Sequence, residues 1–298
     1  MTVLKKFAAY SLPAALFLIL GLLCRCVFFG RSEKLWGTAF DVLAVNSRAY
    51  VCAGGSLIVL DVTDSRDIRL LGQIEISSLA KAVRISGNYA IVAAGERGLR
   101  IIDISDPTAM FEAGGIETPR YALGLLVEDD RVYVNSEGEW IGFDVTNPQN
   151  PVPIAFLPVN FSDKTEAGRH RAGNLIFMAD NASLRVLDHS DPDQAVEIGQ
   201  CTLHPESGIR GPSEIFVTGD RAYISVEARM YEYHLCIVDI SDPADPREIA
   251  TYDTPGSARS VAVFGDLIYV ADGLGGLFVL RHASITYSVH LPLVLSDG

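Results

Sequence analysis

The chain has 298 residues, and its 37 acidic side chains outnumber its 24 lysines and arginines, which gives a formal net charge of −13 at pH 7. A protein that binds nucleic acid needs a basic surface opposite the phosphates, so this charge balance excludes that class of function. The length alone leaves room for two domains, and the internal repeats described below decide between one and two.

The N-terminal region combines positive charge with an apolar run. Lys5 and Lys6 precede an apolar stretch over residues 7–23. This order is typical of an export signal or a membrane anchor, and it predicts an N-terminal apolar helix. Three alternatives remain open: an uncleaved anchor in the membrane through residues 4–29, a cleaved signal, or lipid attachment at Cys24. All three place the rest of the chain outside the cytoplasm, either anchored to the cell membrane or secreted.

The chain after residue 38 repeats one pattern about six times. An apolar run ends in Asp, and a turn resembling Ser-Asp-Pro follows, as in the segment 98–107. The last position of the run is filled in turn by Asp61, Asp103, Asp144, Asp188, Asp239 and Arg281. The steps between these positions are 42, 41, 44, 51 and 42 residues, by subtraction of their numbers. A period of about 40–45 residues with short strands is typical of the blades of a β-propeller.

Each repeat contains four candidate strands separated by turn residues. In the last repeat they are 260–264, 267–271, 277–280 and a final strand within 286–295. Pairs such as Gly265-Asp266 suit tight hairpins, because Gly and Asn tolerate a positive φ. We therefore predict an all-β fold, a six-bladed β-propeller with four-stranded blades over residues 31–298, after a signal or anchor at 1–30. A β-helix is the alternative.

Two submotifs recur in register and resemble those of the LVIVD-repeat proteins. One is the apolar strand with its Asp and Ser-Asp-Pro turn, and the other is a hairpin that matches well at 265–273 and less well at 87–95. The resemblance covers nearly everything after residue 38. It implies a propeller-like β fold in proteins that are commonly exported, and it supplies no catalytic residues. Arg281 and the irregular fourth repeat depart from the family pattern.

The regular parts of the repeat have structural explanations. The repeated Asp precedes a turn in its copies, so we expect it to cap backbone amides there in preference to binding calcium. The tyrosines of the hairpins are expected to pack in the core or between blades; they are Tyr50, Tyr89, Tyr133, Tyr223 and Tyr269.

Three connections are longer than their counterparts in the sixth repeat, at 159–168, 201–213 and 227–235. In a four-stranded meander the connections from strand two to three and from strand four to the next blade lie at the same end, so all three belong to one face. Binding residues often lie on loops that a rigid scaffold holds. The candidate ligand-binding residues are Arg169, His170, Arg171, His204, Glu206, Arg210, Glu214, Glu227, Arg229, Tyr231 and His234.

The innermost strand of the fourth repeat reads Arg169-His170-Arg171, which predicts a basic patch near the mouth of the central channel. One interpretation is a site for an anionic ligand, because guanidinium groups match carboxylates. The other is that this blade is irregular and its arginines pair with Glu166, Asp180 or Glu214. Loop carboxylates and histidines also allow general acid–base chemistry, although no spacing makes this specific.

The sequence favours neither a metal nor a cofactor, since it has no Cys-x-x-Cys motif with partner histidines. Cys52 and Cys236 stand in apolar strands and read as small buried side chains, although Cys201 and Cys236 could also pair. The leading hypothesis is a non-enzymatic module, outside the cytoplasm, that binds a protein or an extracellular polymer through the face with the long connections. The alternative is a secreted hydrolase or lyase with its site at the channel mouth.

Overall fold

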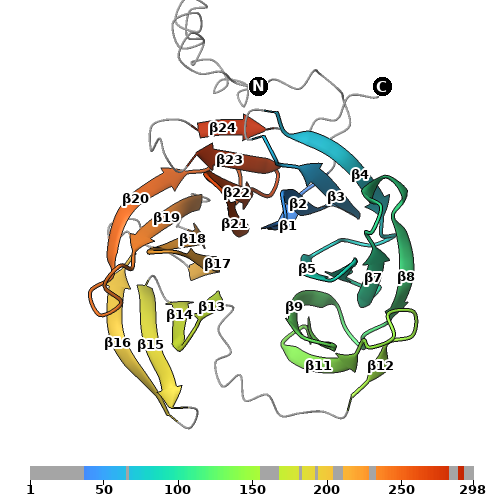
Figure 1. Ribbon diagram of the computed structural model, residues 1–298, viewed down its shortest axis with the longest axis horizontal. Helices are drawn as coiled ribbons and strands as arrows, with labels where there is room; N and C mark the ends of the chain where they lie inside the picture. Colours follow the sequence, from blue (N-terminus) through green and yellow to red (C-terminus); the bar gives the residue numbers. More distant parts are fainter. Residues whose placement is uncertain are drawn as a thin grey trace, which may run out of the picture.

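The computed structural model describes residues 37–64, 67–154, 168–180, 183–191, 194–203, 211–227, 233–281 and 288–291. Within these residues the strands form six antiparallel sheets of four strands each. The sheets are arranged around a common centre, with the first strand of each sheet innermost (Figure 1). The six-bladed β-propeller is thus confirmed, and the β-helix alternative is wrong, because each repeat pairs its own strands into a separate sheet.

The blades follow the order of the sequence. Blades 1 and 2 consist of β1 Ala39–Val45, β2 Arg48–Ala53, β3 Ser56–Asp61, β4 Arg69–Glu75, β5 Ala82–Ser86, β6 Tyr89–Ala93, β7 Leu99–Asp103 and β8 Phe111–Ile116. Blades 3 and 4 consist of β9 Ala122–Glu128, β10 Arg131–Ser136, β11 Glu139–Asp144, β12 Val152–Pro153, β13 Arg169–Ala172, β14 Leu175–Asp180, β15 Ser183–Asp191 and β16 Gln194–Thr202. Blades 5 and 6 consist of β17 Gly211–Thr218, β18 Arg221–Glu227, β19 Tyr233–Asp239, β20 Arg247–Asp253, β21 Ser260–Phe264, β22 Leu267–Ala271, β23 Leu277–Arg281 and β24 Ser288–Leu291.

The predicted N-terminal helix falls in residues 1–36, outside the described residues. In the described part of the chain, the single helix is a 3-10 turn at Pro107–Ala109, and no helix there is long and apolar enough to span a membrane.

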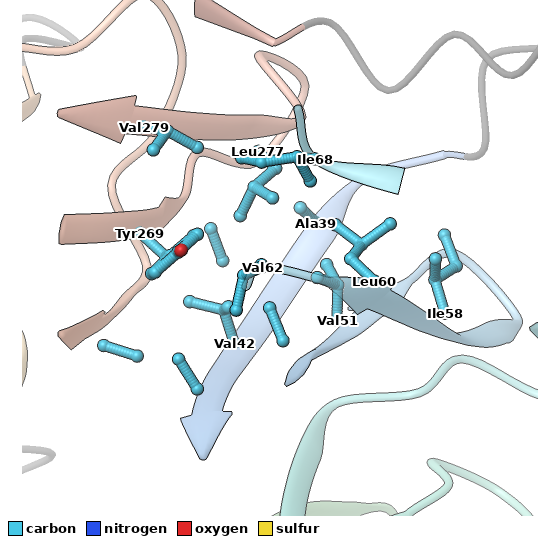
Figure 2. Packing of buried hydrophobic residues seen from close by; sticks show 14 of the residues in the cluster. Ala39, Val42, Val51, Ile58, Leu60, Val62, Ile68, Tyr269, Leu277 and Val279 are labelled. Atoms are coloured by element: carbon cyan, nitrogen blue, oxygen red, sulfur yellow. The ribbon is translucent and has the colours of Figure 1, made fainter. Parts of the chain in front are cut away.

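Within the described residues, buried apolar side chains fill the spaces between blades 1 and 2, 2 and 3, 4 and 5, 5 and 6, and 6 and 1. The ring is joined at its ends by such a cluster between blades 6 and 1, in which Val42, Val51 and Leu60 face Tyr269 and Val279 (Figure 2). Two backbone hydrogen bonds at 2.9 and 3.1 Å also connect Ala39 with Gly273. The final strand predicted within 286–295 is β24, and it pairs with β23 inside blade 6. Packing of whole blades therefore joins the two ends of the ring.

The repeated Asp caps the turn after the third strand, as the sequence predicts. In blades 1 to 5 its Oδ1 accepts a backbone hydrogen bond of 2.8–2.9 Å from the residue two positions later. A hydrogen bond from the side-chain hydroxyl of that residue, followed by the one from its backbone N–H, lowers the pKa of each Asp. Arg281, in the sixth copy, instead pairs with Asp266 of the neighbouring hairpin at 3.2 Å. The hairpin tyrosines also behave as predicted, and Tyr223 and Tyr269 are fully buried.

The turns also make contacts between blades. A glycine at the bulge of the outermost strand touches the proline carbonyl of the next blade's turn so closely that a Cβ would overlap it. The three pairs are Gly72 with Pro107, Gly114 with Pro148, and Gly199 with Pro243. Blade 5 has Ala250 at this register position, and the blade that follows it has Arg281 and no Asp-Pro turn. In blades 1, 2 and 4 the glycine thus faces a proline turn of the next blade, whereas at blade 5 neither is present.

Candidate functional site at the channel mouth

The strand register places the connections β2–β3 and β4–β5, and their counterparts, at the end of the ring where the innermost strands begin. The three long connections all attach at this end, as the sequence predicts. We call this end the channel mouth.

A buried carboxylate lies at the third residue of the innermost strand of blade 1. Asp41 is 4% exposed. Its Oδ1 accepts hydrogen bonds from the backbone N–H of Val42 at 2.9 Å and from the Ser260 hydroxyl at 2.6 Å. Its Oδ2 accepts from the backbone N–H of Val83 at 2.8 Å and from Arg84 Nη1 at 3.0 Å. One carboxylate therefore joins the innermost strands of blades 6, 1 and 2.

Arg84 extends this network to a fourth blade. Its Nη2 donates to Glu214 Oε1, on β17 of blade 5, at 3.3 Å. The Arg84 and Glu214 side chains are 33% and 28% exposed, so they face the channel without being exposed on the outer surface. We call Asp41, Arg84, Glu214 and Ser260 the channel network. It holds together strands that lie far apart in the sequence.

The environment of Glu214 disfavours its charged form. Burial, followed by the negative charge of Asp41, raises the pKa of Glu214 to about 7, against the opposing effect of Arg84. The partly accessible side chain is consistent with this, because protein groups from blades 1, 2 and 6 surround the carboxylate even though the channel lies beside it.

The raised pKa of Glu214 predicts how the stability of the variant Glu214→Gln, relative to the wild type, depends on pH. The folded protein keeps the Glu214 proton between about pH 4.5 and 7, where the unfolded chain has lost it, so the wild type loses stability as pH rises through that window. We expect Glu214→Gln to be more stable than the wild type by roughly 2 kcal/mol at pH 8, and equal to it near pH 5. Urea unfolding at both pH values measures this. The exposed Glu139→Gln is the control, and a difference that is the same at both pH values would contradict the assignment.

A second group, of cations and aromatic rings, lies around the beginning of the innermost strands. Lys81 Nζ is 3.6 Å from the centroid of the Phe40 ring and 5.9 Å from that of Tyr121. The Arg259 guanidinium is 5.3 Å from the Phe40 ring. Burial and the nearby charge of Arg259 lower the pKa of Lys81. We call Phe40, Lys81, Tyr121 and Arg259 the mouth cluster.

Backbone position explains how the mouth cluster forms. Lys81, Tyr121 and Arg259 each directly precede the first strand of a blade. Lys81 and Arg259 donate equivalent backbone hydrogen bonds, to Ala93 and Ala271 at the end of the second strand. Equivalent positions in blades 2, 3 and 6 therefore direct their side chains to one region.

The predicted residues of blade 4 lie on β13, which is not one of the four innermost strands that the channel network joins. The His170 ring packs edge-on against Phe216 of β17 with centroids 5.5 Å apart, and burial lowers its pKa. Arg171 is exposed, and its Nε donates to the carbonyl of Gly173 at 3.2 Å. Among the predicted residues whose side chains are described, Glu214 is the one within the channel network.

The other predicted residues cannot be placed at the site. Arg169, Glu227 and His234 belong to β13, β18 and β19, but their side chains lie outside the described part of the structure. The remaining five lie outside the described residues altogether: His204, Glu206, Arg210, Arg229 and Tyr231.

The described cysteines, Cys52, Cys201 and Cys236, are free thiols. Cys52 and Cys236 are fully buried, as the sequence predicts, and burial raises the pKa of both.

The opposite end of the ring has a hollow of about 560 Å³ between blades 6 and 1. It is lined by Thr63, Asp64, Phe264, Asp266 and Arg281, among others. Its charged side chains sit at turns of the repeat. The channel mouth differs from it in joining charged groups of four blades.

Fold and channel together define a six-bladed β-propeller. The family model for the LVIVD repeat matches residues 79–118, 212–254 and 255–280. These segments correspond to blade 2, blade 5 and the first three strands of blade 6. The resemblance to the LVIVD-repeat proteins is therefore confirmed, because three segments of this propeller match the LVIVD repeat.

Solved structures share the fold at low sequence identity. A chain of the mitotic checkpoint complex is similar with a TM-score of 0.58 and 12% identity, over 93% of this chain and 99% of that one. Sqt1 of Saccharomyces cerevisiae gives 0.57 and 9%, over 85% of each chain. A structural genomics protein of unknown function from Bacteroides thetaiotaomicron gives 0.52 and 13%, over 83% and 70%. No curated protein matches the chain. At these identities the likeness shows the fold alone.

Proposed function

We propose that this propeller is a non-enzymatic binding module that takes its ligand at the channel mouth. The mouth cluster is the observation that carries the proposal. Lys81 and Arg259 lie against one aromatic ring, and neither makes an ion pair with a carboxylate within the described residues. Burial disfavours the charge on Lys81, and a ligand carboxylate would offset that cost.

The channel network supports this role because it makes the mouth rigid. The hydrogen bonds of Asp41 and Arg84 fix the innermost strands of four blades, and two of these strands directly follow Lys81 and Arg259. A site that is fixed before binding loses less entropy when the ligand arrives. The charged groups of the network are bonded to one another. The cations of the mouth cluster are therefore the groups that contact the ligand.

The proposed location is outside the cytoplasm. It rests on the N-terminal sequence, in which Lys5 and Lys6 precede the apolar run over 7–23. The proposed partner is accordingly a protein or polymer of the cell envelope or the exterior, and the first 30 residues would serve as signal or anchor.

One observation favours the enzymatic alternative. A carboxylic acid with a pKa of about 7 in an accessible channel is suited to general acid–base catalysis, and Glu214 has this property. A hydrolase or lyase would use Glu214 on a substrate held at the mouth.

Two assays with wild type and variants separate the two functions. In one the protein captures its partner from a cell-envelope extract, and in the other it is applied to a glycan array. A binding module should capture the same species as wild type and as Glu214→Gln, lose it as the double variant Lys81→Gln/Arg259→Gln, and release it chemically unchanged. Arg171→Gln is the matched control, because it removes an exposed cation on the innermost strand of another blade. Equal capture by the double variant would remove the proposed site. Chemical change of the captured species that disappears with Glu214→Gln would favour the enzyme.

A further inference from the structure

The chemistry of the channel mouth also indicates what kind of ligand fits it. The mouth cluster holds two cations in a protein whose formal net charge is −13. A local positive site on an acidic protein attracts anionic groups, while the surrounding negative charge repels polyanions that extend far beyond the site. The ligand therefore carries its negative charge locally.

Cations lie close to the aromatic rings of the cluster. Lys81 lies over the face of Phe40 at 3.6 Å, and Arg259 approaches the same ring at 5.3 Å. Tyr121 has Lys81 at 5.9 Å and is half-buried. Because Lys81 lies over Phe40 and this ring also packs against the buried apolar cluster between blades 1 and 2, Phe40 does not offer an open face on which a sugar would stack. A carbohydrate polymer is thus a poor fit.

Exposed apolar side chains lie at the same end of the ring as the cluster. Leu79 is 40% exposed and stands two residues before Lys81, and Leu123 is 44% exposed and stands two residues after Tyr121. Leu274 is 84% exposed and follows Gly273, whose backbone is bonded to Ala39 beside Phe40. Leucines next to cations match a surface with both apolar and acidic side chains, which is a property of protein segments.

We infer that the ligand of the channel mouth is a protein segment in which acidic and apolar side chains stand close together. Its carboxylates meet Lys81 and Arg259, and its apolar side chains cover Leu79, Leu123 and Leu274. This inference rests on the proposed binding function and specifies the class of its ligand.

Fluorescence anisotropy with the full chain tests the inference. The probe is a short fluorescein-labelled peptide rich in Glu and Leu. Two further peptides replace every Glu by Gln or every Leu by Ser, and polygalacturonate supplies carboxylates on a carbohydrate. We expect the Glu/Leu peptide to bind, and either replacement to weaken binding about tenfold, which corresponds to about 1.4 kcal/mol. Binding should also fall as salt rises, because the contact charges are partly exposed.

Protein variants test whether the peptide binds at the mouth cluster and the leucines, and they define the results that would overturn the inference. Lys81→Gln/Arg259→Gln and Leu79→Ser/Leu274→Ser should each weaken peptide binding about tenfold, whereas the charge-keeping pair Lys81→Arg/Arg259→Lys and the control Arg171→Gln should retain it. Circular dichroism confirms that each variant is folded. Peptide affinity that is equal in wild type and both double variants, or no peptide binding, overturns the inference. Tight polygalacturonate binding that requires Lys81 and Arg259 also overturns it, but leaves the proposed binding function standing.

Discussion

The variant Asp41→Asn is expected to lower the free energy of unfolding by about 3 kcal/mol, because it disrupts the channel network at its centre. Asp41 accepts four hydrogen bonds, from Val42, Ser260, Val83 and Arg84. An Asn amide has one acceptor oxygen, so its NH2 group would face at least one donor. The Arg84 guanidinium would also lose one of its two carboxylate partners while remaining mostly buried. The penalty of leaving buried donors unpaired dominates the loss.

Urea unfolding at pH 7 measures this loss, and two variants serve as comparison. Asp61→Asn changes an Asp near the surface whose Oδ1 accepts hydrogen bonds from the neighbouring Thr63, so we expect it to cost less than about 1 kcal/mol. The double variant Asp41→Asn/Arg84→Met removes the guanidinium as well and should regain part of the stability. If Asp41→Asn unfolded at the same urea concentration as Asp61→Asn, the network would not stabilise the ring.

The architecture was predictable because it depends on features that recur. The copies of the repeat share a short apolar strand and a hairpin turn, and five of the six have a capping Asp, so the period and the turn residues point to the same fold. The strands predicted for the last repeat agree closely with β21 to β23. The joining of the ring was harder to predict, because it depends on packing between blades 6 and 1, which no turn residue marks.

The site was less predictable, because it arises where different repeats meet. The sequence drew attention to Arg169 and Arg171, two cations in one strand, whereas the structure uses one charged residue from each of several strands. Asp41 and Glu214 each follow a bulge and occupy the same register position of their innermost strands, and Arg84 lies two residues further along β5. A charge at either position in an otherwise apolar strand is the signal that could have been found.

The mouth cluster also has a signal in the sequence. Lys81 and Arg259 directly precede innermost strands, and so does Arg210, a predicted residue that lies outside the described part of the chain. Comparing equivalent positions across the repeats would have grouped these cations. A single repeat does not reveal the group, because its cations lie in different blades and are far apart in the sequence.

The glycine at the outer bulge should tolerate no side chain where the next blade has a proline turn. We expect Gly114→Ala to lower the free energy of unfolding by roughly 3 kcal/mol, since a Cβ there would overlap the carbonyl of Pro148 and backbone atoms of Gln149. Both neighbours are backbone of an Asn-Pro turn that Asn147 caps, so they cannot rotate away as a flexible side chain would. Urea unfolding at pH 7 measures the change.

Blade 5 provides the matched control for this prediction. Ala250 occupies the same bulge position, and blade 6 has no proline turn to meet it, so Ala250→Gly should cost no more than about 1 kcal/mol, the ordinary penalty of a glycine in a strand. These two opposite substitutions, at the same bulge position of blades 2 and 5, would thus have unequal effects. Similar losses for Gly114→Ala and Ala250→Gly would mean that the turns do not hold adjacent blades together. Unequal losses would explain why Arg281 is accepted in the last repeat: the blade before it has no glycine that requires the proline turn.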